Sequence, residues 1–313
     1  MSSYRLALVF AFVAVLAGVS CRSRTSVATA DNELHTDYAD LFGVLGPNDL
    51  ERWVAVRTKL RAGLDRACAG SACGGYTDLS TVQITCSASL ARHTMHECAW
   101  IVGGSIDAVD GATGAHSGGP RAITCTVPTP LTTSAFLDTL TVAGDAALDT
   151  PLAGTGHSLH DALLACLAAP DAGAAPSADP ANDFVALEDL FPAGTKQGDA
   201  WRSIGRSLQT SFDDACGDTF CEGDYADIRA LRLACAVDRR RSVVQTCTWS
   251  FAMVSIDVAA NGAINAVTAT RTCPVTVDAP VTALLAALAG SKPLHATLPG
   301  RGTALNDALI GCL

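Results

Sequence analysis

The clearest pattern of apolar and polar positions along the chain is a helical one that occurs twice. Apolar residues recur at i, i+3, i+7 and i+11, which is the spacing of one face of an α-helix. Each pattern follows an Asp-Leu-Phe tripeptide, at 40–42 and at 189–191. We therefore predict one amphipathic helix in each half of the chain. Its apolar positions are Trp53, Val56, Leu60 and Leu64 in the first half, and Trp201, Ile204, Leu208 and Phe212 in the second.

Each helical pattern is followed by an alternation of apolar and polar residues, which predicts β-strands. Turn signals divide the alternation into three strands, and they include Asp110-Gly111 in the first half and Asn261-Gly262 in the second. Short helical patterns follow the third strand. We therefore predict an α+β fold of two tandem homologous modules, each with a helix, a three-stranded antiparallel meander and C-terminal helices. The alternating residues of the first strands are Leu79, Val82, Ile84 and Cys86, and Ile228, Leu231, Leu233 and Cys235.

Twelve of the thirteen cysteines support the duplication, because they form two sets of six with nearly the same internal spacing. The four tryptophans also fall into matched positions. We assign the first six-cysteine module to 39–167 and the second to 182–313, joined by a linker rich in Ala and Pro at 168–181. The two sets are Cys68, Cys73, Cys86, Cys98, Cys125 and Cys166, and Cys216, Cys221, Cys235, Cys247, Cys273 and Cys312.

An even number of cysteines at a repeated spacing predicts disulfide bonds formed in an oxidising compartment. Within each module the first two cysteines are close enough for a local clip, and the third and fourth face each other across a hairpin. The fifth falls on the other face of the sheet, provided that the second hairpin has no bulge, and this leaves it for the sixth. We predict the pairs Cys68–Cys73, Cys86–Cys98, Cys125–Cys166, Cys216–Cys221, Cys235–Cys247 and Cys273–Cys312.

The N-terminus predicts export. Arg5 precedes an apolar run at 6–18 that is too short for a permanent membrane span, a layout typical of a signal peptide, which we assign to 1–20. Cys21 lies outside the two cysteine sets and follows this run, where a bacterial lipoprotein carries its lipid. We therefore predict a lipid on Cys21 and a polar tether at 21–38.

The alternative is ordinary signal cleavage near Ser20 or after Ala30, which would give a soluble secreted or periplasmic protein. Composition narrows the partners in either case. Hydrophobic residues make up 49% of the chain, enough for a core in each module, and the net charge of −10 argues against nucleic acid or an anionic membrane surface as partner. Membrane contact is expected only through the lipid on Cys21. The chain carries no phosphate-binding loop, dinucleotide glycine fingerprint or calcium loop, so we predict no cofactor.

Histidines are concentrated in the first module, where His93-x-x-His96-Glu97 and His157-x-x-His160-Asp161 each combine two imidazoles with a carboxylate. Such a set is able to hold a transition metal. A turn or strand does not fix the rings on one side as a helix would, so the spacing alone favours solvated turn histidines. Metal binding is kept as an alternative.

The segment Gly156-His157-Ser158-Leu159-His160 is faintly similar to a Gly-x-Ser-x-Gly nucleophile elbow, with His160 in place of the second glycine. A secreted hydrolase using Ser158 and His160 is therefore a second alternative. The pattern is better explained by the start of a helix, with Ser158 as N-cap and Asp161 as the third helical residue.

No catalytic motif is therefore assigned, and we do not expect an enzyme. The sequence predicts an exported, lipid-anchored bacterial protein of the cell envelope that acts as a binding or scaffolding module. The expected partner is an envelope or extracellular protein.

Overall fold

The computed structural model describes residues 37–68, 73, 75–168, 183–192, 194–215 and 227–313. The predicted signal peptide, the lipid site Cys21, nearly all of the tether and linker, and the pair Cys216–Cys221 lie outside these residues. The described residues from 37 onward belong to a single compact unit. No described helix is long and apolar enough to cross a membrane.

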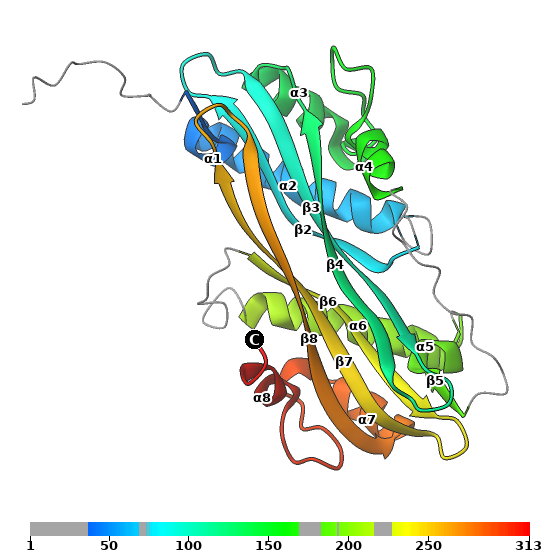
Figure 1. The fold of residues 1–313 in the computed structure, drawn as a ribbon. Coiled ribbons are helices and arrows are strands. Elements are labelled where there is room, and N and C mark those ends of the chain that lie inside the picture. The colour runs from blue at the N-terminus through cyan, green and yellow to red at the C-terminus, as the bar shows by residue number, and fades with distance from the viewer. Residues whose placement is uncertain (1–36, 69–72, 74, 169–182, 193, 216–226) are drawn as a thin grey trace, which may run out of the picture. The chain divides into compact units, whose positions relative to one another are not determined.

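The two halves repeat one order of elements (Figure 1). In the first half these are β1 (Tyr38–Asp40), α1 (Leu41–Val44), α2 (Pro47–Ala67), β2 (Thr77–Ser89), β3 (Met95–Val109), β4 (His116–Pro128), α3 (Thr133–Ala143), the 3-10 turn η1 (Gly144–Ala146) and α4 (Leu159–Leu167). In the second they are β5 (Phe184–Ala186), α5 (Leu187–Leu190), α6 (Lys196–Ala215), β6 (Asp227–Asp238), β7 (Val243–Val258), β8 (Ile264–Pro280), α7 (Val281–Leu288), the 3-10 turn η3 (Pro293–His295) and α8 (Leu305–Ile310).

The strands form two antiparallel sheets, with orders β1-β2-β3-β4 and β5-β6-β7-β8. The protein is therefore α+β, but each sheet has four strands and not the three that alternation predicts. The extra strands, β1 and β5, have three residues each and pair with the ends of β2 and β6. A segment of three residues is too short to display an alternating pattern.

The Asp-Leu-Phe tripeptides do not occupy equivalent places in the two halves. Asp40 ends β1 and caps α1, accepting a hydrogen bond of 2.8 Å from the Phe42 amide. Asp189 lies inside α5, whose first residue is Leu187. Because Leu41 and Leu187 both follow the short strand and are fully buried, Phe42 corresponds in space to Glu188.

Five disulfide bonds link the described cysteines, and all five are among the six predicted pairs. Two of them join β2 to β3 and β6 to β7 directly across the hairpins, and two fasten α4 and the end of the chain after α8 to the third long strand of each sheet. Such bonds are typical of an extracytoplasmic protein. The five are Cys68–Cys73, Cys86–Cys98, Cys125–Cys166, Cys235–Cys247 and Cys273–Cys312.

The expectation that the fifth cysteine lies on the other face of the sheet is wrong. Cys125 is opposite Trp100 and Cys273 is opposite Trp249, two residues after Cys98 and Cys247 and therefore on the same face as these cysteines.

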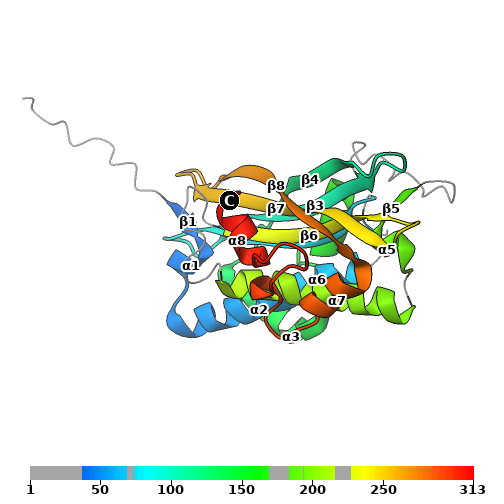
Figure 2. The ribbon, with the colours of Figure 1, turned by 90° about the horizontal axis from the view of Figure 1, so that it is seen from below.

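Each half has its own core between its sheet and its helices. Trp53 on α2 and Trp100 on β3 are buried in the first core, and Trp201 and Trp249 are buried in the second. The helices of each half contact the sheet of their own half, α2 against β2 and α6 against β6, and Figure 2 draws these helices below the strands. Alternation along β3 and β7 sends Trp100 and Trp249 toward these helices and leaves the next residues for the opposite face.

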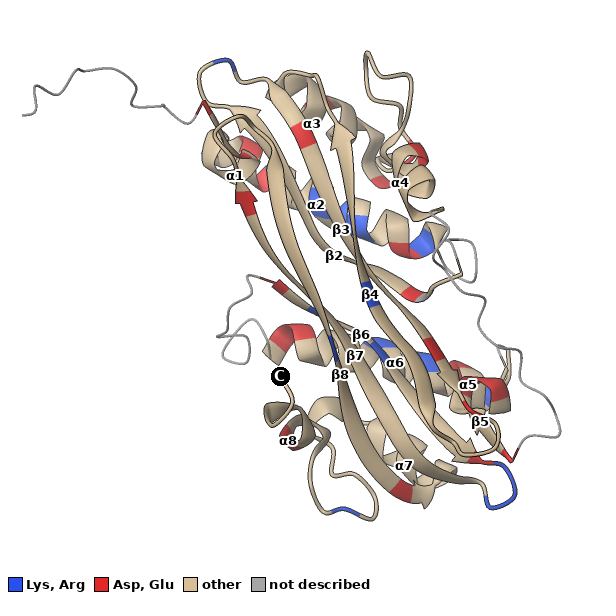
Figure 3. Cartoon of the chain, viewed as in Figure 1, with Lys and Arg blue, Asp and Glu red and all other residues tan. Residues whose placement is uncertain are grey.

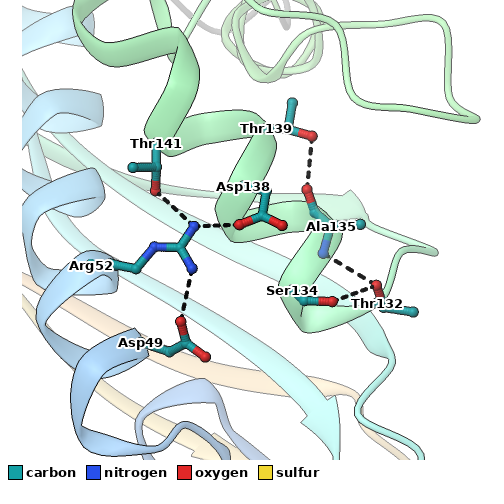
Figure 4. Close-up of polar contacts among 8 residues, drawn as sticks. All are labelled: Asp49, Arg52, Thr132, Ser134, Ala135, Asp138, Thr139 and Thr141. Carbon is teal, nitrogen blue, oxygen red and sulfur yellow. Dashed lines mark hydrogen bonds and ion pairs between the residues drawn. The ribbon is translucent and has the colours of Figure 1, made fainter.

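In the first half a polar contact also ties α3 to α2 (Figure 4). Arg52 of α2 donates to Asp49 at 2.8 Å on its own helix and to Asp138 at 2.5 Å on α3. The side chain of Thr132 caps α3 by accepting from the Ala135 amide at 3.2 Å. The second half has Ala200 at the position of Arg52, so this ion pair belongs to the first half.

The opposite faces of the two sheets pack against each other through a third apolar cluster. Each half supplies three of its buried members, which are Val82, Ala99, Ile101, Leu231, Ala252 and Val254. Gly103 lies at the centre of this contact. A Cβ there would lie 2.9 Å from the Cβ of Ala252, which is its own counterpart in the second half. The contact therefore has room for one methyl group, and only the second half carries it.

The long hairpins cross this contact and reach the other half. The turn after β3 accepts a hydrogen bond from the Phe184 amide of β5 at the Gly111 carbonyl, at 3.0 Å. The turn after β7 accepts one from the Ser87 hydroxyl of β2 at the Gly262 carbonyl, at 2.6 Å. Since each hairpin tip is bonded to the opposite half, the two halves hold each other reciprocally.

Candidate binding site

The first histidine pair lies around the turn between β2 and β3. His93 is exposed with a positive φ of 51°, and the His96 ring packs edge-on against Tyr38 with centroids 5.4 Å apart. Glu97 accepts a hydrogen bond of 2.7 Å from the Ile264 amide of the other half. These contacts give the carboxylate a role in joining the halves. Within the described residues, no group of three or more His, Cys, Asp or Glu side chains is placed to hold a metal ion.

The second candidate segment forms the start of α4. The Ser158 hydroxyl accepts from the Asp161 amide at 3.1 Å, and Asp161 accepts from the Ser158 amide at 2.9 Å, which is a capping box. The hydrogen bonds that the Asp161 carboxylate accepts from the Ser158 amide and from the Ser158 hydroxyl lower the pKa of Asp161. His160 instead bonds through Nδ1 to Asp149 at 2.8 Å. Ser158 and His160 therefore engage different carboxylates, and their described contacts do not form a Ser-His-Asp relay.

This segment borders an apolar pocket of about 580 Å³, which His157, Ser158 and Asp161 line together with Pro128 and Leu152. The polar atoms of Ser158 and Asp161 are already bonded to each other, so the pocket offers a ligand mainly apolar contact.

A second pocket, of about 330 Å³, lies between α6 and β6. Its apolar lining includes Trp201, Leu208 and Trp249, all buried. Gly205 lies in the middle of α6, and apart from its chain neighbours and the adjacent helix backbone no heavy atom of the described residues lies within 4 Å of the place where its Cβ would be. Glycine is unfavourable inside a helix by about 1 kcal/mol relative to alanine. Here it opens space where close packing does not require a glycine. We call this the Gly205 pocket.

The same place in the first half is filled. By the matched tryptophans and cysteines, Gly205 corresponds to Arg57 and Arg232 of β6 corresponds to Gln83 of β2. Arg57 lies over the ring of Phe42, 4.9 Å from its centroid, and donates to Gln83 at 2.6 Å. An arginine side chain therefore occupies in the first half the space that is open in the second.

The strands bend in the same way at both places. Register irregularities fall at Val82 in β2 and at Leu231 in β6, and they free one carbonyl of each strand from the sheet. Arg61 of α2 donates to the Val82 carbonyl at 3.3 Å, and Gln209 of α6 donates to the Leu231 carbonyl. The helix thus satisfies the bulged carbonyl in each half, and Gln209 is held at the edge of the Gly205 pocket.

At these places, charged residues of one half interact with oppositely charged residues of the other half. Arg232 pairs with Glu188 of α5 and lies 3.4 Å from Asp78 of the first half. Burial raises the pKa of Asp78, although Arg232 opposes the rise. Reciprocally, burial raises the pKa of Asp227 of the second half, against the opposing effect of Arg61 and Arg57.

The mouth of the Gly205 pocket is basic on the helix side. Arg202 and Arg206 line it from successive turns of α6, whereas the first half has Val54 and Thr58 at these positions of α2. Figure 3 shows basic segments on both helices. The pocket and the two arginines therefore occur together, in one half only.

Sequence patterns did not single out the Gly205 pocket. A signal was available, because glycine is an unusual residue in the middle of an amphipathic helix and the matched residue is arginine. The pocket itself depends on residues of α5, α6, β6, β7 and the first half.

Comparisons with known proteins do not assign the chain to a family. No family model and no curated protein matches it. Among solved structures, an acyl-CoA hydrolase from Agrobacterium tumefaciens is 13% identical, with 78% of this chain and 95% of that chain covered and a TM-score of 0.11. At a TM-score this low, the match carries no argument about fold or function.

Proposed function

We propose that the protein is an exported, lipid-anchored binding protein of the cell envelope, and that the Gly205 pocket is its ligand site. The observation that carries the proposal is the contrast between the open pocket at Gly205 and the filled space at Arg57. A pocket with an apolar floor and a few convergent polar groups is the usual form of a ligand site.

The rigidity of the surroundings supports a binding role. Disulfides fix the sheet behind the pocket, at Cys235–Cys247, and the end of the chain, at Cys273–Cys312. A site held by cross-links loses little conformational entropy when a ligand binds. The expected ligand source is a protein of the envelope or the extracellular medium.

The binding role is tested by affinity capture from an envelope extract with three forms of the protein. Gly205→Arg fills the pocket with the residue that the first half uses. Ser203→Arg is the matched control, because it adds the same charge on the exposed face of α6. We expect a partner retained by the wild type and by Ser203→Arg and lost with Gly205→Arg. Retention by all three forms would contradict the assignment of the site.

The anchor is tested separately by metabolic labelling with a clickable fatty acid. We expect the wild type to be labelled and membrane-associated, and Cys21→Ser to be unlabelled and released. Ser23→Ala, two residues away, is the control and should retain the label. An unlabelled wild type would favour the soluble secreted or periplasmic alternative.

A further inference from the structure

We infer that the Gly205 pocket binds a carboxylate attached to an apolar or aromatic group. The inference rests on the proposed function, since it names the class of ligand for the same site. The group that enters the pocket is apolar, and the carboxylate stays at the mouth.

The floor determines the apolar part. Trp201 is 7% exposed and Trp249 is 1% exposed, and both line the pocket with Leu208 and Leu233. Displacement of water from apolar walls of this kind by an apolar group is favourable. Aromatic side chains also pack favourably against a flat ring.

The first half indicates the size. There the corresponding space holds the side chain of Arg57, whose three methylene groups lead to a planar guanidinium. A group of similar length and thickness, such as a benzyl or a short alkyl group, matches that space. The pocket volume of about 330 Å³ is near the lower end for ligand sites, which fits one small group.

The mouth determines the charge. Arg202 and Arg206 add two positive charges at the helix side of the pocket, in a chain whose net charge is −10. Arg202 also pairs with Asp199 on the same helix, and an exposed pair of this kind contributes little stability, so a ligand can compete for it. Arginine guanidinium groups bind carboxylates with directional, charge-assisted hydrogen bonds.

The acidic residues that line the pocket are paired with an arginine other than Arg202 and Arg206. Glu188 and Asp78 lie around Arg232, which is 11% exposed at its side chain and is shared between them. Their charges are thus directed to the strand side, at β6. Gln209 lies between the two sides and is committed to the Leu231 carbonyl.

The inference is tested by titrating the purified protein with phenylacetate and with its neutral analogue phenylacetamide, followed by calorimetry and by tryptophan fluorescence. Trp201 and Trp249 line the site, so occupancy should change the emission. We expect saturable binding of phenylacetate and binding of the amide weaker by on the order of ten-fold, because a charged hydrogen bond is lost.

Three variants locate the effect. Gly205→Arg should abolish binding, Ser203→Arg should leave it unchanged, and Arg206→Gln should weaken the acid by about ten-fold while leaving the amide within about two-fold. Thermal unfolding should show that Gly205→Arg is folded. Equal binding of acid and amide, or unchanged binding by Gly205→Arg, would overturn the inference.

A second titration, with peptides, distinguishes the two possible sources of such a carboxylate, a protein C-terminus and a small acid. A tripeptide ending in a free C-terminal phenylalanine is compared with the same peptide amidated. Tighter binding of the free-acid peptide than of the amidated peptide supports the ligand class, whether or not phenylacetate binds. Binding of the peptide without phenylacetate indicates a protein C-terminus as the source, and binding of phenylacetate without the peptide indicates a small acid. If neither acid binds while envelope capture still depends on Gly205, the ligand class is wrong and the proposed function stands. Loss of both results would count against the proposed function itself.

Discussion

The two halves build the same junction between helix and sheet from different residues. In the first half Arg57 and Arg61 extend from α2 to Gln83, and in the second the arginine, Arg232, is on the strand and α6 contributes Gly205 and Gln209. In each half arginine still opposes the rise in the pKa of an aspartate of the other half: Arg232 acts on Asp78, and Arg57 and Arg61 act on Asp227. The comparison shows that this electrostatic interaction between the halves occurs whether a helix or a strand supplies the arginine. Moving it to the strand is what leaves a pocket on the helix side.

The largest expected effect concerns a feature that the halves share. Replacing Cys125 and Cys166 by alanine should lower the free energy of unfolding by about 4 kcal/mol, because it removes a cross-link between residues 41 positions apart. The pair Cys273 and Cys312, separated by 39 positions, should give nearly the same loss. Urea unfolding of both double variants measures this. A difference above about 2 kcal/mol would show that the halves are not equivalent in stability.

The next effect tests the single methyl group at the contact between the sheets. Gly103→Ala should lower the free energy of unfolding by about 2 kcal/mol, because its Cβ would lie 2.7 Å from Leu231 and 2.9 Å from Ala252. The double variant Gly103→Ala with Ala252→Gly keeps one methyl group at this point and should recover most of the loss. Denaturant unfolding of the three variants forms a double-mutant cycle. Additive losses would show that the two residues do not share this space.

A smaller effect of opposite sign is expected at the Gly205 pocket. Gly205→Ala should raise the free energy of unfolding by about 1 kcal/mol, because alanine is the better helix residue and its Cβ meets open space. The mirror change, Arg57→Gly, should lower it by at least about that amount, because it also removes the contacts with Phe42 and Gln83. Thermal unfolding compares the two. A loss of stability in Gly205→Ala would mean that the glycine is required for packing.

The smallest expected effect is on pH dependence. Burial raises the folded-state pKa of Asp227 above 3.8, so its protonation favours the folded state. The stability it contributes is present below pH 3.8 and is lost as the pH rises through the raised pKa. Asp227→Asn should therefore flatten the fall in unfolding free energy above pH 3.8, measured by denaturant unfolding.

Asp110 provides the control of opposite sign. Hydrogen bonds from Thr113 lower its folded-state pKa below 3.8, so its contribution is present above pH 3.8 and is lost as the pH falls through the lowered pKa. Asp110→Asn should flatten the acid side of the curve. Identical curves for the two variants would show that neither carboxylate acts through its surroundings.

Much of the fold follows from local sequence patterns. The spacing of Trp53, Val56, Leu60 and Leu64 predicts α2, and all four residues are buried in the first core. Alternation predicts the long strands, and the hairpin register brings Cys86 opposite Cys98 and Cys235 opposite Cys247. These features depend on residues close together in the chain, where periodicity and turn chemistry act directly. A common origin of the two halves remains a prediction from the cysteine spacing.

Local sequence patterns predict less of the candidate site. The first histidine pair and the Ser158 segment stand out in the sequence by their reactive residue types, and the structure gives Ser158 a helix cap and His160 a separate carboxylate. The Gly205 pocket consists mostly of residues that also serve the core. Their arrangement around a missing side chain distinguishes it, and the sequence signal for it is a glycine where the first half has Arg57.

The amino-acid sequence by itself determined the order of helices and long strands, the duplication of the cysteine pattern and the cysteine pairs that the structure contains. The tertiary structure alone decided how the sheets face each other, that one methyl group fits between Gly103 and Ala252, and that Arg232 meets Asp78. The physical reason is the distance along the chain over which each interaction acts. Hydrogen-bonded periodicity is set over a few residues, whereas packing volume and charge pairing arise between side chains that the chain brings together from more than a hundred positions apart.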